Sequence, residues 1–198
     1  MFKRICKITF ITHGATIYSA SGIINDKNNC PILNDTGEEE INLVCNYLKA
    51  KGIAYDNIYT CPTTCCTQSA QAIAKIFKQK PKKLEVLSRN HGDWQGTSLA
   101  DLYQEYGPEL LSTTPKNGES LNDFNKRVAE TIKKLIDENK GNRIIIVTSP
   151  EIVQSALAQT LNITEENQYK ILIKTGSLTQ ISYFKDWSSV IYSNYTPL

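Results

Sequence analysis

The 198-residue sequence predicts a three-layer α/β/α sandwich, with a mainly parallel sheet and helices on both of its faces. Short apolar, β-branched segments alternate along the chain with segments of helical periodicity, as expected of successive βα units. The hydrophobic content of 40% and charged content of 21% are typical of a globular protein. No linker or low-complexity stretch divides the chain, so we expect a single domain over residues 1–198.

The first half of the chain predicts strands and helices in alternation. Thr36 and Glu39 have the spacing of a capping box, and Gly52 stands where a helix commonly ends. The expected elements are a strand over Lys7–Thr12, a helix over Leu33–Gly52, a strand over Asn57–Thr60, a helix from Pro62 to about Lys78 and a short strand over Leu84–Leu87.

The second half continues the alternation and then becomes rich in strands. Ser149-Pro150-Glu151 combines a cap, a first-turn proline and an acid, which favours a helix start. The strand-rich end predicts antiparallel additions to the sheet. The expected elements are helices over Ser98–Tyr106 and Ser120–Glu138, a buried strand over Arg143–Thr148, a helix from Ser149 and strand-like stretches over Tyr169–Lys174, Leu178–Phe184 and Val190–Tyr195.

Composition excludes several classes of protein. A net charge of +2 gives no basic surface for nucleic acid or for an anionic membrane. No stretch approaches the ~18 apolar residues of a membrane span, and the N-terminal stretch lacks an uninterrupted signal-peptide core. The six cysteines suggest reduced thiols, so we expect a cytoplasmic protein.

The carboxyl ends of the strands are where a parallel sheet places its ligands. Thr12-His13-Gly14 follows the first predicted strand, and Ser149 follows the strongest one. The chain has two histidines, His13 and His91. A lone histidine is more often structural than catalytic, and for His91 we expect a packing or edge role rather than catalysis.

Seven segments nonetheless resemble, in order, the motifs of the histidine phosphatase superfamily, the phosphoglycerate mutase-like proteins. The loop at His13 is similar to the Arg-His-Gly-Glu-Thr motif of that family, without its arginine. The seven segments are Thr12–Thr16, Leu33–Gly37, Ile58–Pro62 with Gln68-Ser69-Ala70, Gly92–Gly96, Gly118–Leu121, Ile144–Thr148 and Gly176–Thr179.

The resemblance implies a chemistry in which the first histidine takes up a phosphoryl group. In the family, two arginines, a second histidine and usually an asparagine hold the phosphate, and an acid protonates the leaving oxygen; no cofactor is needed. These roles suit phosphoryl transfer, which depends mostly on positioning and charge neutralisation. At the matching positions this chain has Thr12 and Cys65 for the arginines, Ser19 for the asparagine, Ser88 for the acid and Ser149 for the second histidine.

The substitutions predict an inactive or very weak phosphatase that keeps His13 and Gly14 and acts by binding. Losing one pre-organised donor typically costs a factor of about 10² to 10³ in rate. The alternative is an active phosphomonoesterase or mutase with a rearranged pocket, in which Arg89 or Lys27 replaces the missing arginines. The expected partner is a phosphorylated small molecule or a protein, and dimerisation through a sheet edge stays open.

A zinc site is a third hypothesis, because thiolates and imidazole together suit that metal. His13, Cys61, Cys65 and Cys66 are its candidate ligands, from loops that this fold class brings together. Their spacing matches no zinc motif, and neighbouring residues on a helix point apart. Small buried thiols are the simpler explanation, so we expect no metal.

Overall fold

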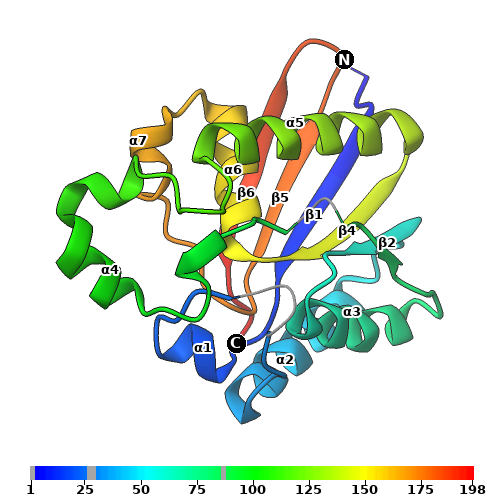
Figure 1. Cartoon of the computed structure of the whole chain (residues 1–198). Coiled ribbons are helices and arrows are strands. Elements are labelled where there is room, and N and C mark those ends of the chain that lie inside the picture. Colours follow the sequence, from blue (N-terminus) through cyan, green and yellow to red (C-terminus); the bar gives the residue numbers. More distant parts are fainter. Residues whose placement is uncertain (1–2, 26–29, 86–87) are drawn as a thin grey trace.

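A computed structural model describes residues 3–25, 30–85 and 88–198 and has a six-stranded sheet at its centre (Figure 1). The strand order is β3-β2-β4-β1-β5-β6. The first four strands in this order are parallel, whereas β5 and β6 are antiparallel additions, as predicted. The strands are β1 (Cys6–Thr12), β2 (Asn57–Thr60), β3 (Lys82–Lys83), β4 (Arg143–Thr148), β5 (Leu178–Tyr183) and β6 (Ser188–Tyr195).

Two pairs of helices cover the sheet. Helix α2 packs on α3, and α5 packs on α6. Right-handed crossovers place the two pairs on opposite faces, and Figure 1 shows α5 and α6 in front of the sheet. The predicted three-layer architecture is therefore confirmed. The helices are α1 (Ile17–Ala20), α2 (Asp35–Lys51), α3 (Thr64–Ile76), α4 (Leu99–Tyr106), α5 (Leu121–Glu138), α6 (Pro150–Leu161) and α7 (Glu165–Gln168), with 3₁₀ turns at Gly92–Trp94 and Gly107–Leu111.

The core lies on both sides of β1 and β4. Ile144, Ile145, Ile146 and Val147 are each 0% exposed, because helices cover both faces of their strand. Burying one such side chain stabilises the fold by roughly 1.5–3 kcal/mol. The continuous apolar run in the sequence is thus explained by its place in the middle of the sheet.

Polar caps set the helix starts, with one difference from expectation. Ser98 and Ser120 cap α4 and α5 as the sequence predicts. Helix α2 is instead capped by Asn34, whose side-chain oxygen accepts a hydrogen bond from the Gly37 amide at 2.8 Å. Thr36 therefore lies inside the first turn, and the predicted capping box is wrong because asparagine is the stronger cap here.

The strand expected over Leu84–Leu87 is placed too late in the sequence. Strand β3 is Lys82–Lys83, which pairs with Tyr59 and Thr60 of β2. Leu84 adds one backbone hydrogen bond to the Thr60 carbonyl at 2.8 Å. The prediction is based on the apolar residues of the segment. The strand instead consists of two exposed lysines, whose backbone groups pair with β2. Residues 86–87 lie outside the described residues.

The stretch Tyr169–Lys174 is not a strand. Its backbone forms local turns, since the Lys170 and Ile171 amides donate to the carbonyls three residues before them. The Gln154 side chain donates to the Ile171 carbonyl at 2.8 Å. With these groups already paired, the segment folds as a loop that carries Tyr169 toward the carboxyl end of the sheet.

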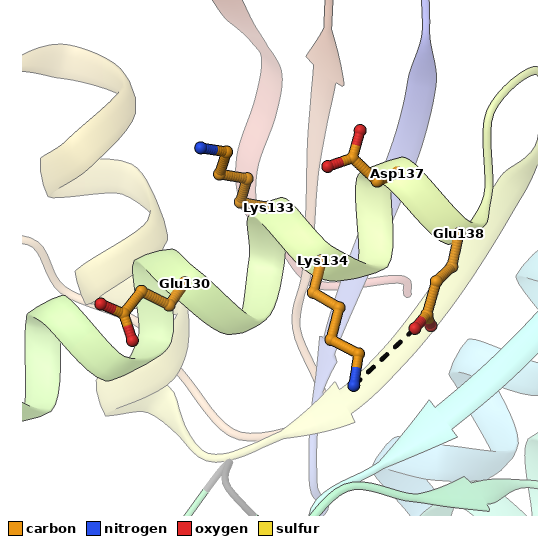
Figure 2. A pocket seen from close by; sticks show the side chains of 5 residues that line it. All are labelled: Glu130, Lys133, Lys134, Asp137 and Glu138. Atoms are coloured by element: carbon orange, nitrogen blue, oxygen red, sulfur yellow. Dashed lines mark ion pairs between the residues drawn. The ribbon is translucent and has the colours of Figure 1, made fainter.

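The outer face of α5 is charged. Figure 2 shows Glu130, Lys133, Lys134, Asp137 and Glu138 around a shallow depression of about 450 Å³. Lys134 Nζ lies 3.9 Å from Glu138 Oε1, an exposed pair that contributes little stability. None of the helices in the described ranges combines the length and apolar character needed to cross a membrane.

Candidate site at the carboxyl ends of the parallel strands

The ends of three parallel strands meet at one edge of the sheet. Thr12 of β1 pairs with Thr148 of β4, and Thr60 of β2 pairs with Val147. The residues that follow, His13, Cys61 and Ser149, therefore leave the sheet at the same edge. This is where doubly wound sheets bind ligands, and a cavity of about 410 Å³ opens there.

Backbone packing fixes the loop after β1. A Cβ atom on Gly14 would collide with the Gly37 carbonyl, and one on Gly37 would collide with Ala15. Glu40 of α2 accepts a hydrogen bond from the Ala15 amide at 2.8 Å and one from the Thr175 hydroxyl at 2.9 Å. The loop is thus held against the start of α2 by contacts that only glycines permit.

The His13 ring is buried, and a hydrogen bond holds it in one orientation. The residue is only 3% exposed, and its Nδ1 lies 2.8 Å from the Gly14 carbonyl oxygen. A carbonyl oxygen only accepts, so Nδ1 is the donor in this bond. The other ring nitrogen, Nε2, is left for interactions in the site.

A group of thiols lies beside His13. Cys30 and Cys65 place their sulfur atoms 2.9 Å apart, and the Thr63 hydroxyl lies 3.6 Å from the sulfurs of both Cys61 and Cys65. All six cysteines are free and buried. Within the described ranges, no group of three or more His, Cys, Asp or Glu side chains is arranged to hold a metal ion, so the geometry gives the zinc hypothesis no support.

His13 and Cys65 form a pair of opposite charges. Burial by itself lowers the pKa of His13, but the neighbouring Cys65 and the Gly14 carbonyl outweigh it and raise the pKa to about 9. The pKa of Cys65 is lowered, chiefly by hydrogen bonds from Cys30 and Cys66 and also by the His13 charge. The two shifts have opposite directions and favour an imidazolium beside a thiolate at neutral pH.

The cavity is mostly apolar and contains one ion network. Arg89 Nη1 donates to the Tyr169 hydroxyl at 2.8 Å and lies 3.5 Å from Glu151 Oε1. His91 Nε2 lies 3.1 Å from Glu151 Oε2. The lining residues are His13, Ser19, Ile23, Ile24, Asn25, Arg89, His91, Trp94, Leu99, Leu110, Ser149, Pro150, Glu151, Gln154, Tyr169 and Thr175.

Glu151 is the charge at the centre of that network. Burial raises the pKa of its carboxyl, but His91 and Arg89 more than offset burial and bring the pKa down to about 2. The carboxylate is therefore ionised at neutral pH and lies in the first turn of α6. Among the described residues that line the cavity, Arg89 is the one lysine or arginine, and Glu151 already neutralises it.

The residues matched to the family pocket fall into two groups. His13, Ser19 and Ser149 line the cavity. The Thr12 hydroxyl is instead committed to the Lys174 carbonyl at 2.7 Å. The remaining positions, Gly14, Cys65 and Ser88, do not line the cavity, and the Ser88 carbonyl accepts from Arg127 at 3.2 Å. Lys27, the other replacement considered for the arginines, lies outside the described residues.

Sequence reasoning misses three residues that belong to the candidate site or contact its residues. His91 is expected only to pack, yet it lines the cavity and contacts Glu151. Tyr169 is assigned to a strand, and Cys30 has no motif around it. The position of His91, directly before the Gly92–Gly96 segment, is a usable signal, whereas nothing local marks Cys30 as a neighbour of Cys65.

Comparisons with known proteins agree on the fold and the family. The family model described as histidine phosphatase superfamily (branch 1) matches residues 8–196. A broad-specificity phosphatase of Saccharomyces cerevisiae is 24% identical over 191 residues, which cover 93% of this chain and 82% of that protein. Phosphoglycerate mutase-like protein 4 of Arabidopsis thaliana is 29% identical over 167 residues, which cover 75% of this chain and 68% of that protein.

Solved structures show the same architecture. A phosphoserine phosphatase from Entamoeba histolytica in complex with 3-phosphoglyceric acid has a TM-score of 0.83 at 20% identity and covers 97% of this chain and 98% of its own. The α-ribazole phosphatase from Shigella flexneri has a TM-score of 0.83 at 18% identity and covers 96% of both chains. At such identities the likeness establishes the fold alone.

Proposed function

This chain belongs to the histidine phosphatase superfamily, and we propose that it is a pseudophosphatase, a binding protein on a phosphatase fold. The observation that carries the proposal is the setting of His13, a buried ring beside the Cys65 thiol that raises its pKa. Attack on phosphorus requires a lone pair on the ring nitrogen, and an imidazolium has none. The pKa of about 9 keeps His13 protonated at neutral pH because Cys65 stands beside it.

The charges around the cavity support the same conclusion. A phosphoryl group in transfer needs cations at its oxygens. Here Arg89 is bound to Glu151 and Tyr169. The Glu151 carboxylate itself would repel a phosphate dianion. Each missing donor costs a factor of about 10² to 10³ in rate, so the combined losses leave little turnover.

The lining of the cavity supports a proposal for the class of ligand that is bound instead. Ile23, Ile24, Trp94, Leu99 and Leu110 supply an apolar wall, and Tyr169 and the Glu151 network supply a small polar group. Such a mixture suits a small organic ligand with an apolar body. The sequence predicts a phosphorylated small molecule or a protein as partner. We favour a small molecule, but one without a phosphate dianion, whose polar group lies at Tyr169 and the Glu151 network, with a protein partner as the second class.

An active phosphatase is the second candidate function. Two observations favour it: His13 and Arg89 line the same cavity, and a relative from Saccharomyces cerevisiae is a broad-specificity phosphatase. In this mechanism Arg89 would leave Glu151 to hold a phosphate oxygen, and His13 would first lose its proton. Activity of this kind rises with pH as the imidazolium is deprotonated.

Hydrolysis of p-nitrophenyl phosphate by the wild type and by His13→Ala separates the two candidates. For a pseudophosphatase we expect equal background rates in both proteins from pH 5 to 9 and no acid-labile phosphate on the protein. Turnover that disappears with His13, or a trapped phosphohistidine, refutes the proposal. A folded Thr12→Arg, Cys65→Arg, Ser88→Glu, Ser149→His variant is expected to gain activity if the family positions still converge on His13.

A further inference from the structure

Two cysteines from distant parts of the chain, neither of which lines the cavity, lie in contact. Cys30 precedes α2, and Cys65 lies in the first turn of α3. Their sulfur atoms are 2.9 Å apart, and Cys30 is the donor in this contact. A disulfide has a sulfur–sulfur distance of about 2.05 Å, so a small movement of the Cys30 side chain would close the bond.

We propose that Cys65 is a peroxide-reactive thiol and that Cys30 resolves it to a reversible Cys30–Cys65 disulfide. This modification site goes beyond the proposed binding function and does not depend on it: the two share His13, but the reacting groups are the thiols of Cys30 and Cys65, which do not line the cavity. The geometry that supports it is the contact between the two sulfurs, together with a histidine beside one of them.

The pKa is lowered at Cys61 and at Cys65, and of these two Cys65 is the one whose sulfur contacts Cys30. The thiolate is the reactive form of a cysteine, and the Cys30 thiol and the His13 charge both lower the pKa of Cys65. Burial instead raises the pKa of Cys6 to about 11 and also raises that of Cys45. These two cysteines are buried like Cys65, but burial outweighs the nearby Arg4 and Lys49 and keeps their pKa values raised, so they serve as internal controls.

The chemistry balances with hydrogen peroxide as the oxidant. The Cys65 thiolate attacks one peroxide oxygen, the O–O bond breaks, and the departing hydroxide takes the proton of the His13 imidazolium to leave as water. Cys65 is then a sulfenic acid. The Cys30 sulfur next attacks the Cys65 sulfur, the S–O bond breaks, and the hydroxide leaves with the Cys30 proton as a second water. Two thiols are oxidised, and one peroxide is reduced.

The burial of the pair favours a small oxidant. Cys65 is 0% exposed and Cys30 is 9% exposed. Hydrogen peroxide is little larger than water, whereas oxidised glutathione is a tripeptide dimer that must reach the sulfur directly. We therefore expect peroxide to oxidise the folded protein much faster than glutathione disulfide does.

The test treats the full chain with one equivalent of hydrogen peroxide at pH 7 and follows each cysteine by isotope-coded alkylation. Cys30 and Cys65 are expected to lose their free thiols together, at least tenfold faster than Cys6 and Cys45. The intact mass falls by the two hydrogens of one disulfide, and dithiothreitol restores it. Digestion by trypsin and then at glutamate separates Cys30 from Cys45, and fragmentation of the linked peptide identifies its partner.

Variants assign the two roles. Cys30→Ser leaves the reaction at the sulfenic acid, which dimedone labels at Cys65. Cys65→Ser yields neither the disulfide nor a dimedone adduct at Cys30, and Cys45→Ser behaves as the wild type. His13→Asn lowers the oxidation rate about tenfold at pH 7, because it removes a charge that favours the Cys65 thiolate and the proton that the departing hydroxide takes.

Two results overturn the proposal. One is a wild-type protein in which all buried cysteines oxidise at the same rate. The other is a peroxide-induced disulfide that joins a different pair, such as Cys61 and Cys66. Both are read on the wild-type chain, so the conclusion stands even where a variant fails to fold.

Discussion

Removing the charge of Glu151 tests the ion network in the cavity. The pKa of this carboxyl is about 2, against an ordinary value of 4.5. A shift of that size corresponds to roughly 3 kcal/mol of stability, at ~1.4 kcal/mol per pKa unit. The side chain is 27% exposed, so solvent screens part of this energy. We therefore expect Glu151→Gln to lower the free energy of unfolding by about 2 kcal/mol at pH 7.

The sign of the pH dependence follows from the direction of the shift. Because the folded pKa lies below the unfolded one, the stabilisation is complete above about pH 5 and is lost as the pH falls toward 2. The protonated carboxyl of the wild type and the amide of the variant are both neutral, so the two proteins should converge in stability at low pH.

Urea unfolding followed by tryptophan fluorescence, at several values between pH 7 and pH 2.5, measures this difference. The matched control is Glu130→Gln on the outer face of α5 (Figure 2), away from the ion network. We expect less than ~0.5 kcal/mol from the control. A Glu151→Gln loss as small as that of the control at pH 7, or one that does not shrink as the pH falls, refutes the ion network.

Three further variants test the loop, the helix cap and the histidine. In Cys65→Ser the pKa of His13 should fall from about 9 toward its ordinary value or below, as imidazole NMR titration measures; an unchanged pKa would show that Cys65 is not the cause. Gly14→Ala should destabilise the protein by ~2 kcal/mol or more in urea, because the new methyl meets the Gly37 backbone; a loss under ~0.5 kcal/mol contradicts the contact. Asn34→Ala should cost ~1 kcal/mol, and no loss would mean that α2 is capped otherwise.

The sequence predicts most of the architecture because the elements have local causes. The apolar run of β4, the caps of α4 and α5 and the glycine after α2 each act within a few residues. Errors arise where the cause is remote. Strand β3 forms because its backbone pairs with β2. Its two lysines have no alternation of apolar and polar residues that would predict a strand.

The site is harder to predict because it depends on distant contacts. Motif order places His13 and Ser149 at the same cavity correctly. The same reasoning places Glu151 at a helix start, and misses its contacts with Arg89 and His91. It also interprets Cys65 as a lost arginine, whereas its contact with Cys30 joins residues that no sequence spacing relates.

The close packing of Gly14 on Gly37 bears on how sequences with this fold diverge. Any larger residue at either position strikes main chain, so selection for folding alone retains both glycines. The requirement for glycine at these two positions therefore comes from main-chain packing, and it holds whatever chemistry the neighbouring cavity performs.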